Sequence, residues 1–310
     1  MSITFSRTRR PAPSRARRCS GVDNVDVAVN HYENFPVASV LCPARLRPAV
    51  EAIYRFARTA DDIADEGPAD ASTRLSDLGA FRDDLYAVAS GASASSRWPE
   101  VFDRLRPVLA QFQLPLNLLT DLLSAFEQDV SKAHYADRGE LLDYCRRSAN
   151  PVGRLLLHLY RVGGELALSR SDAICTALQL ANFWQDLGVD AARDRYYVPD
   201  EDCKRHGIAA QPLWERRDTA ASRAVVTDLV HWTRTLMHSG APLVHQVQGR
   251  AGWELRLVVQ GGLRILQRID QLQGATSETR PTLKAADAAI MLWRALRMRA
   301  PRPITAAACP

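Results

Sequence analysis

The chain has 310 residues, of which 46% are hydrophobic and 24% are charged, so it can bury a large core and global disorder is excluded. A formal net charge of +5 favours anionic partners, although it does not distinguish nucleic acid, lipid and phosphate. No run of 18 apolar residues occurs, so we expect no membrane-spanning helix, and any membrane contact would be peripheral.

The first 24 residues are basic. Six arginines lie between residues 7 and 18, and no apolar stretch follows them, so this segment is not a secretory signal. Its composition predicts a disordered tail over residues 1–24, with loose attachment to anionic lipid as the alternative. A short flexible tail is also expected over residues 299–310. The six cysteines form no CxxC pair and no zinc-ligand spacing, which indicates reduced thiols in a cytoplasmic protein.

Residues 25–298 are predicted to form a single all-α domain. Apolar residues recur at helical spacing, as in Leu78, Phe81 and Leu85, and no alternating apolar and polar stretch competes with this pattern. Glycine and proline between the apolar blocks divide the region into roughly eight to ten helices. Most of the connecting loops are short, and the two loops expected to be long enough to act as mobile lids are at about residues 196–215 and 239–252.

The first acidic motif is ARTADDIADEG at residues 57–67. Tyr54, Arg58, Asp61 and Asp65 follow the spacing i, i+4, i+7 and i+11, so they line one face of the helix that ends near Gly67. Neighbouring carboxylates repel each other, and this repulsion destabilises the helix unless cations or solvent relieve it. A solvated acidic helix end is one interpretation, and a cation-binding face is the other.

A second acidic motif, QLANFWQDLGVDAARDRYY, occupies residues 179–197. Asn182, Asp186 and Asp190 are spaced i, i+4 and i+8 and share one helical stripe. Their neighbours are apolar and aromatic, so the stripe is expected to face a cavity or to be paired. Mg²⁺ prefers a few carboxylates, waters and phosphate oxygens. The two motifs therefore predict a magnesium-diphosphate site, in which Arg193 and Arg195 hold phosphate oxygens.

Two other interpretations of the acidic stripes were considered. A carboxylate-bridged di-iron site would need Glu-x-x-His motifs on facing helices, and neither stripe contains one. An ion-pair network that holds the helices together stays open, because arginines accompany both stripes.

The residues resemble a known family, the head-to-head prenyl synthases, which include squalene, presqualene diphosphate and phytoene synthases. DDIAD at 61–65 looks like the first motif of that family, and NFWQDLGVD at 182–190, continued by ARDRYYVP, looks like the second. The resemblance covers about residues 28–270. It implies an isoprenoid synthase fold, a single all-α bundle with a central cavity, in which two aspartate-rich helices bind Mg²⁺ and the substrate diphosphate.

The resemblance also implies roles for individual residues. Those on the metal side, with the four aspartates as the catalytic set, are Asp61, Asp65, Asn182, Asp186 and Asp190. Those expected to bind the substrate are Phe35, Tyr54, Arg58, Tyr144, Gln179, Arg193 and Arg195. Asp129 is a weaker candidate for the rim of the cavity. The chain departs from the family at Gly262, where many members have tyrosine, so Arg264 is only a candidate diphosphate contact.

Three stretches resemble one branch of the family, the hydroxysqualene synthases of the bacterial hopanoid pathway: HYENFPVAS at 31–39, CRRSANPVGRL at 145–155 and ANFWQDL at 181–187. This resemblance implies a carbon-oxygen lyase that ionises presqualene diphosphate, rearranges the cation and adds water to give hydroxysqualene without NADPH. Alternatives are condensation of two prenyl diphosphates to presqualene diphosphate, squalene or phytoene, and, more remotely, a non-catalytic helical assembly factor.

The stretch SANPVG at 148–153 has polar residues where relatives often carry small or apolar ones. Our hypothesis is that a break in the helix at Pro151, together with Ser148 and Asn150, positions the water that adds to the cation. The alternative is that Asn150 simply caps or satisfies the break.

The expected partners follow from the same interpretation. They are a prenyl or presqualene diphosphate substrate, a presqualene diphosphate synthase that hands this substrate over, and the inner face of the membrane. The arginine-rich tail has no interleaved aromatic residues and the chain has no helix-turn-helix pattern, so no nucleic-acid partner is expected.

Overall fold

The computed structural model describes residues 41–208 and 217–299. The predictions for the tail at 1–24, for Phe35 and for residues 300–310 lie outside these ranges. Every regular element in the described residues is a helix, and the one β contact is an isolated bridge between His134 and Tyr196. None of the described helices is both long enough and apolar enough to cross a bilayer. The all-α prediction is confirmed.

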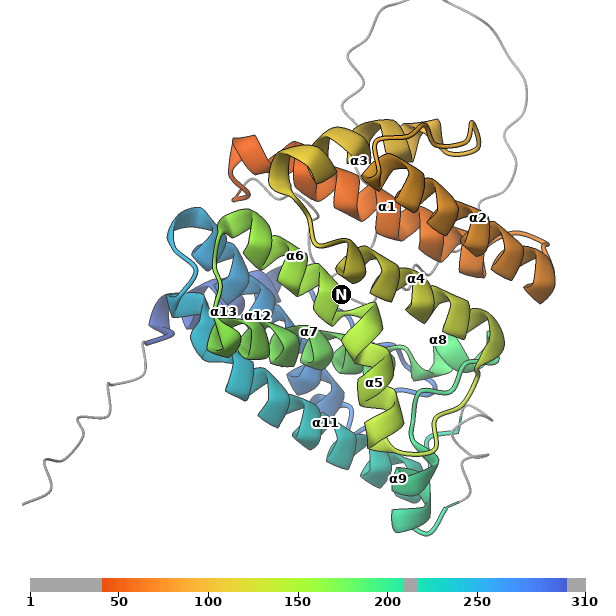
Figure 1. The fold of residues 1–310 in the computed structure, drawn as a ribbon. Coiled ribbons are helices and arrows are strands. Elements are labelled where there is room, and N and C mark those ends of the chain that lie inside the picture. The colour runs from red at the N-terminus through yellow and green to blue at the C-terminus, as the bar shows by residue number, and fades with distance from the viewer. Residues whose placement is uncertain (1–40, 209–216, 300–310) are drawn as a thin grey trace, which may run out of the picture.

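Four helices and a short 3-10 turn form the first half of the molecule, at the top of Figure 1. They are η1 (Ala44–Leu46), α1 (Arg47–Asp65), α2 (Ala71–Ala89), α3 (Pro99–Phe112) and α4 (Leu116–Ser131). The backbone leaves α1 through Gly67, whose φ of 82° favours glycine. Asp70 then caps α2 by accepting a hydrogen bond of 2.8 Å from the Thr73 N–H. The first acidic motif therefore lies at the C-terminal end of α1.

The middle of the chain forms four helices, and one of them, α7, lies at the centre of the molecule. The four are α5 (Arg138–Ser148), α6 (Asn150–Tyr160), α7 (Glu165–Gln185) and α8 (Leu187–Ala191). The break between α5 and α6 falls at Ala149, and Pro151 lies in the first turn of α6, where its missing N–H costs no helical hydrogen bond. α7 packs against α5, α6, α11 and α12, so the second acidic motif, which starts at its C-terminal end, is central. The prediction of one continuous helical stripe is wrong, because α7 ends at Gln185 and α8 begins at Leu187, so Asp186 lies between the two helices and Asp190 lies on α8.

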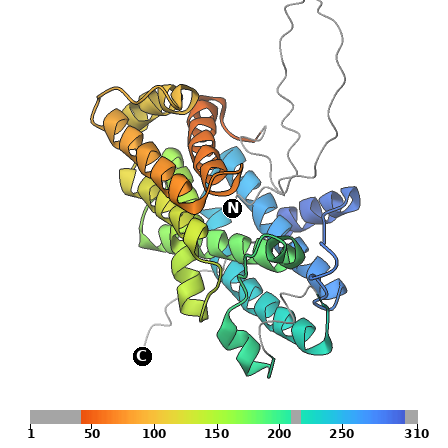
Figure 2. The same ribbon diagram turned by 90° about the vertical axis from the view of Figure 1, so that its right-hand side faces the viewer.

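The last part of the described chain is formed by α9 (Asp200–Arg205), α11 (Ala220–Gly240), η2 (Ala241–His245), α12 (Gly249–Gln271) and α13 (Ala285–Arg297). The predicted loop at 239–252 is wrong, because its first residues end α11, the 3-10 helix η2 fills its middle and α12 has begun by Gly249. The predicted loop at 196–215 contains the short helix α9, and its residues 209–215 lie outside the described ranges. Figure 2 shows α13, in dark blue, at the edge of the molecule, where it packs mainly against α12.

The closest approach of α7 and α11 requires a glycine. A Cβ added at Gly240 would lie 2.6 Å from the Arg170 carbonyl oxygen and 2.7 Å from Ile174 Cγ1. We expect Gly240→Ala to lower the free energy of unfolding by about 1–3 kcal/mol, because helix backbone must move to make room. The midpoint of urea denaturation measures this change.

Gly79 in α2 provides the matched control, since no atom lies within 4 Å of its added Cβ. We expect Gly79→Ala to stabilise the protein by about 0.5–1 kcal/mol, because alanine favours a helix interior. A loss of stability at Gly79 equal to that at Gly240 would contradict the packing explanation.

Candidate active site

The structure joins the two acidic motifs through an arginine. Asp65 is the last residue of α1, and Arg195 follows α8. Arg195 Nη1 donates to Asp65 Oδ2 at 2.7 Å, and Nη2 of the same guanidinium donates to Asp65 Oδ1. Side chains 130 positions apart in the sequence therefore form a partly buried bidentate ion pair, the strongest geometry for a guanidinium and a carboxylate.

A second arginine reaches the site from the loop between α12 and α13. Arg280 Nε donates to Asp186 Oδ1 at 2.5 Å, and its Nη2 donates to Oδ2 at 3.2 Å. Gln185 Nε2 donates to the Pro281 carbonyl at 2.6 Å and fixes the same loop against α7. Asn182 Nδ2 also donates to Asp186, at 3.0 Å. Arg280 was not predicted, since neither helical spacing nor motif pattern links it to Asp186.

The buried carboxylates repel one another. Burial raises the pKa of Asp61 well above its ordinary value, and the charge of Asp65 raises it further. Burial likewise raises the pKa of Asp190, with a further contribution from Asp186. Asp65 also raises the pKa of Asp190, so the carboxylates of the two motifs lie within electrostatic reach of each other.

Asp129 and Tyr144 extend the site along α4 and α5. Tyr144 Oη donates to Asp129 Oδ2 at 2.7 Å, and the tyrosine ring packs against Phe183 and Tyr197. Burial raises the pKa of Asp129 to about 7, while the positive charge of Arg195 opposes this shift. Asp129, only a weak candidate in the sequence, thus belongs to the same cluster as Asp65 and Arg195.

The remaining predicted polar residues lie around these carboxylates. Arg58 pairs with Asp61 at 3.2 Å and with Asp62 at 2.5 Å, so it lies beside the first motif as expected. The side-chain oxygens of Gln179 and Ser148 are buried without a hydrogen-bond partner. Such orphaned polar atoms are uncommon in folded proteins, and a bound ligand or water would satisfy them.

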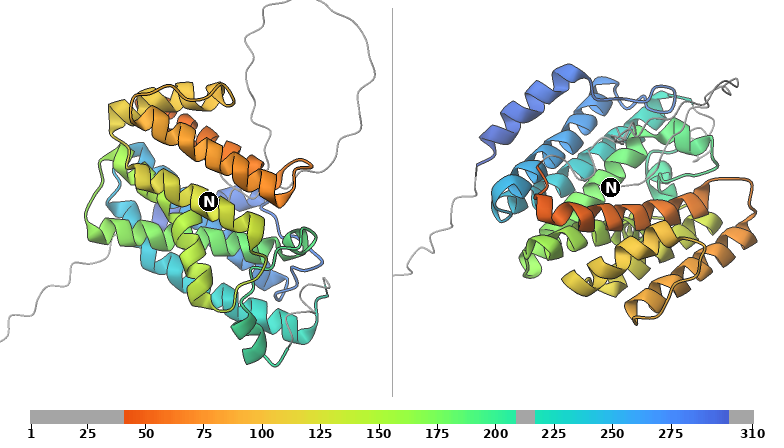
Figure 3. Two further views of the ribbon diagram at one scale, coloured as in Figure 1. Left: turned by 45° about the vertical axis from the view of Figure 1, so that its right-hand side comes forward. Right: turned by 90° about the horizontal axis from the view of Figure 1, so that it is seen from above.

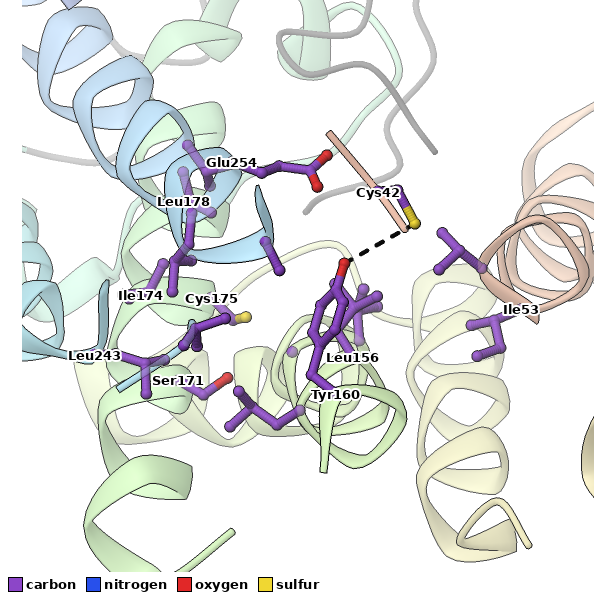
Figure 4. Close-up of a pocket in the computed structure, with 18 of the residues that line it drawn as sticks. Cys42, Ile53, Leu156, Tyr160, Ser171, Ile174, Cys175, Leu178, Leu243 and Glu254 are labelled. Atoms are coloured by element: carbon purple, nitrogen blue, oxygen red, sulfur yellow. Dashed lines mark hydrogen bonds between the residues drawn. The ribbon is translucent and has the colours of Figure 1, made fainter. Parts of the chain in front are cut away.

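An apolar cavity of about 170 Å³ lies along the same helices (Figure 4). On α1 its lining runs from Val50 to Ala57, the residue before Arg58, and on α7 it ends at Leu178, one turn before Asn182. Tyr160 and Cys42 approach each other at its edge, with Oη and Sγ 4.0 Å apart. The other lining residues are Val50, Ile53, Ala57, Val152, Gly153, Leu156, Leu157, Ser171, Ile174, Cys175, Leu243, Val247, Ala251, Glu254, Leu255 and Val258.

The sequence pattern of the Squalene/phytoene synthase family matches residues 28–287, which include both acidic motifs. The chain belongs to this family. It is 35% identical over 241 residues to a hydroxysqualene synthase of Rhodopseudomonas palustris, covering 76% of this chain and 79% of that protein. With a hydroxysqualene synthase of Zymomonas mobilis the identity is 36% over 208 residues, covering 66% of this chain and 67% of the relative.

Solved structures agree with the family fold. The crystal structure of squalene synthase HpnC from Alicyclobacillus acidocaldarius matches with a TM-score of 0.72 at 34% identity, over 78% of this chain and 90% of that one. A dehydrosqualene synthase in complex with ligand matches with a TM-score of 0.73 at 21% identity, over 84% and 89% of the two chains. The predicted isoprenoid synthase bundle is therefore confirmed, and the protein is an enzyme of the squalene/phytoene synthase family.

The structure explains how this family member accommodates Gly262 on α12. A Cβ at this position would lie 2.7 Å from Met237 Cε and 2.9 Å from Leu178 Cδ2, so these two side chains fill the space that a larger residue would need. Arg264, a candidate diphosphate contact, instead pairs with Asp287 at 2.5 Å and fixes α13 to α12. It is not part of the acidic cluster.

Arg193 lies in a second, more polar cavity beside the family motifs. This cavity has a volume of about 310 Å³ and also includes Asp129 and Arg195, together with Arg74 and Lys132. It therefore meets the acidic cluster from the side of α2 and α4, whereas the apolar cavity lies along α6, α7 and α12.

The raised pKa of Asp129 predicts how stability depends on pH. Its ordinary pKa is 3.8, and the value in the fold is about 7. The folded state therefore binds this proton more tightly, and the resulting stabilisation is lost as pH rises from about 4 through 7. We expect the urea midpoint of the ligand-free protein to fall between about pH 4 and 7, and Asp129→Asn to flatten that slope. An unchanged slope in the variant would show that other groups cause it.

Proposed function

We propose that this chain is a hydroxysqualene synthase, which converts presqualene diphosphate and water to hydroxysqualene and diphosphate. The observation that carries the proposal is the continuity of two environments along α1 and α7. On α1, Tyr54 lines the apolar cavity, and one turn later Arg58 lies beside the acidic cluster. On α7, Leu178 lines the cavity, and one turn later Asn182 bonds to Asp186 of the cluster. A substrate with two long apolar chains and one diphosphate needs this arrangement. The names of the relatives support the choice of substrate.

The donor set at the acidic cluster supports Mg²⁺ held together with a diphosphate. Within residues 41–208 and 217–299, no three His, Cys, Asp or Glu side chains lie close enough to hold a metal ion by themselves. Mg²⁺ does not require such a cage, because it usually keeps several waters and takes one or two carboxylates plus substrate phosphates. Burial, together with repulsion from neighbouring carboxylates, raises the pKa values of Asp61 and Asp190, and bound cations would relieve that repulsion.

The metal-side residues in this proposal are Asp61, Asp65, Asn182, Asp186 and Asp190. When bound there, Mg²⁺ neutralises negative charge on the departing diphosphate. Arg195 and Arg58, and also Arg193, donate to phosphate oxygens, and these bonds strengthen as the C–O bond breaks and charge moves to the leaving group. Gln179 supplies its orphaned amide oxygen to a water or to the metal shell.

The apolar cavity would enclose the carbocation that is left after the diphosphate departs. Its walls exclude water, so rearrangement precedes capture, and Tyr54 presents an aromatic ring on which positive charge is stabilised. Tyr144, held by Asp129, lies on the other side of the cluster and orients its hydroxyl toward a carboxylate. Water is then added without a hydride, so we expect no requirement for NADPH.

Asn150 is the proposed holder of the added water. Its Oδ1 accepts a hydrogen bond of 3.0 Å from Thr176 Oγ1, and the buried hydroxyl of Ser148 near the same break has no partner. We expect Asn150→Leu to lower the alcohol-to-hydrocarbon product ratio by about tenfold, because the hydrogen bond that holds the water contributes about 0.5–1.5 kcal/mol. Mass spectrometry of the products measures the ratio.

Thr176→Val distinguishes positioning of the water by Asn150 from a purely structural hydrogen bond at the helix break. The variant removes the Thr176 hydroxyl that donates to Asn150 but keeps the Asn150 amide. If Asn150 only satisfies the break, both variants lower the melting temperature and neither changes the product ratio, which would sink the water-positioning role.

Incubation of the purified protein with Mg²⁺ and presqualene diphosphate, without NADPH, tests the proposed reaction. We expect hydroxysqualene in the extracted lipids and none after addition of EDTA. Condensation of farnesyl diphosphate without conversion of presqualene diphosphate would retain the fold and the acidic site but assign the sister activity, which the phytoene synthases among the relatives represent.

The cellular setting is proposed from the chemistry of the substrate. Presqualene diphosphate has a very apolar body and a charged head, so we place the enzyme in the cytoplasm, in peripheral contact with the inner face of the membrane. The same property favours hand-over of the substrate from a presqualene diphosphate synthase. Binding of the two purified enzymes to each other would test the hand-over directly.

A further inference from the structure

The outer face of α13 exposes a cluster of large apolar side chains. Leu292, Trp293 and Leu296 are 51%, 53% and 62% exposed, and their spacing of i, i+1 and i+4 places them on one face of the helix. Trp253, at the start of the neighbouring α12, is 42% exposed. Seen from above, α13 lies along the rim of the molecule beside α12 (Figure 3, right). We call Trp253, Leu292, Trp293 and Leu296 the α13 patch.

The opposite face of α13 is fixed to the body of the protein. Asp287 is buried and accepts hydrogen bonds from Arg268 and from the Lys284 N–H, at 2.8 and 2.7 Å. Arg256 Nη1 donates to the carbonyl oxygens of Ala295 and Met298, at 3.2 and 2.8 Å. The helix is therefore held at both ends, and the exposure of the patch is not a sign of a loosely attached segment.

Positive charges predominate around the α13 patch, and the carboxylate next to Trp253 in the sequence, Glu254, is half-buried and lines the apolar cavity. Arg294, Arg297 and Arg299 follow or interleave with the apolar residues, and Arg250 lies near Trp253 in the sequence. Arg297 stacks over the Trp293 ring, with its Cζ 4.1 Å from the ring centroid. Asp287 is the one acidic residue between positions 285 and 299, and it is buried in ion pairs. The patch thus combines exposed tryptophan and leucine with cations and no exposed carboxylate on its own helix.

We propose that the α13 patch docks the enzyme on a bilayer that contains anionic lipids. Leucine and tryptophan enter the boundary between headgroups and acyl chains, while the arginines meet the lipid phosphates, as in amphipathic helices that lie in the membrane plane. A second copy of the chain fits the patch less well. A two-fold contact would bring each arginine-rich face against its own copy, and like charges would oppose each other.

Docking at this surface would bring the apolar cavity close to the bilayer. Ala251, Leu255 and Val258 line the cavity on one side of α12, while Arg256 bonds to α13 on another. Met298, just after α13, packs against the hydrophobic cluster that contains Ala251 and Leu243. One helix therefore separates the patch from the cavity. The binding itself does not require the proposed reaction, so the two can fail independently.

Flotation with lipid vesicles tests the docking surface on the full-length protein. The probes are vesicles of phosphatidylcholine alone and of phosphatidylcholine with a quarter of phosphatidylglycerol. We expect binding to the anionic vesicles that weakens at high salt, because screening reduces the attraction to lipid phosphates. Replacing Leu292, Trp293 and Leu296 together by serine should lower the partition coefficient by about tenfold or more.

The matched control replaces exposed apolar residues on other helices. Leu166 and Tyr86 are 58% and 48% exposed, and the double variant Leu166→Ser/Tyr86→Ser should bind vesicles like the wild type. Thermal melting confirms that each variant is folded. Turnover in detergent should be unchanged in the α13 variant, since none of its three residues contacts the acidic cluster or the cavity.

Several results would overturn the proposal. Equal vesicle binding by the wild type and the α13 variant would do so, as would no binding by the wild type. If a full-length variant with the six arginines at 7–18 changed to glutamine loses binding while the α13 variant retains it, the basic tail is the anchor instead. If the wild type is a dimer and the α13 variant a monomer, the patch is a subunit interface.

Discussion

Asp61→Asn and Asp186→Asn are each expected to lower kcat by about three orders of magnitude. Each removes a carboxylate charge from the buried cluster, on which the proposed Mg²⁺-diphosphate site depends. Metal stabilisation of a leaving group contributes several kcal/mol, and each 1.36 kcal/mol corresponds to a factor of ten in rate. Steady-state turnover of presqualene diphosphate over a range of Mg²⁺ concentrations measures the loss.

Stability separates a chemical effect from misfolding in this experiment. Burial and the charge of Asp65 raise the pKa of Asp61, so its ionised form destabilises the ligand-free fold. Asp61→Asn should therefore lose turnover while the protein becomes more stable at alkaline pH. A variant that loses both activity and stability would contradict this assignment.

Asp84 is a suitable control for substituting a buried aspartate. Its oxygens accept hydrogen bonds from the Ser95 N–H and hydroxyl, both at 2.6 Å, near the C-terminal end of α2 and not at the end that follows the first acidic motif. Asp84→Asn should lower stability and leave kcat unchanged. Loss of turnover in this variant would mean that activity simply follows the integrity of the fold.

The sequence predicted the fold and the local parts of the site, because both depend on short-range spacing. Apolar periodicity indicates helices wherever it occurs, and i, i+4 spacing puts Asn182 and Asp186 on one face without any knowledge of tertiary structure. The hydrogen bond between these two side chains follows directly from that spacing. The prediction of a loop at 239–252 was wrong because Gly240 was interpreted as a breaker, whereas it provides a close helix contact.

Partners that come from distant parts of the chain could not be predicted. Arg280 meets Asp186 across 94 positions and Tyr144 meets Asp129 across 15, and neither separation is a helical repeat of one element. Trp184 likewise donates its indole N–H to Thr233, 49 positions away, at 2.7 Å inside the core. Such contacts depend on how the helices pack, which local patterns do not encode.

Arg195→Gln is expected to lower kcat by about two to three orders of magnitude. Arg195 is partly buried and bonds to both oxygens of Asp65, so it lies where the proposed diphosphate would meet the first motif. Loss of one preorganised donor at a site of developing charge costs about 2.7–4 kcal/mol. Arg195→Lys keeps the charge but not the planar fork, so we expect it to recover only part of the rate.

A double-mutant cycle with Asp65→Asn distinguishes two roles of Arg195. If the guanidinium only positions Asp65, the double variant will be no slower than Asp65→Asn alone, because the partner is already lost. If Arg195 also binds the leaving diphosphate, the double variant will be slower than either single variant. The ion pair in the ligand-free structure favours the second role. In that role the Arg195 guanidinium occupies the place of a metal ion beside Asp65, and it would bind phosphate oxygens instead when substrate and metal are present. Additive losses in the cycle, together with a raised KM for Mg²⁺ in Asp65→Asn but not in Arg195→Gln, would be the expected signature of that exchange.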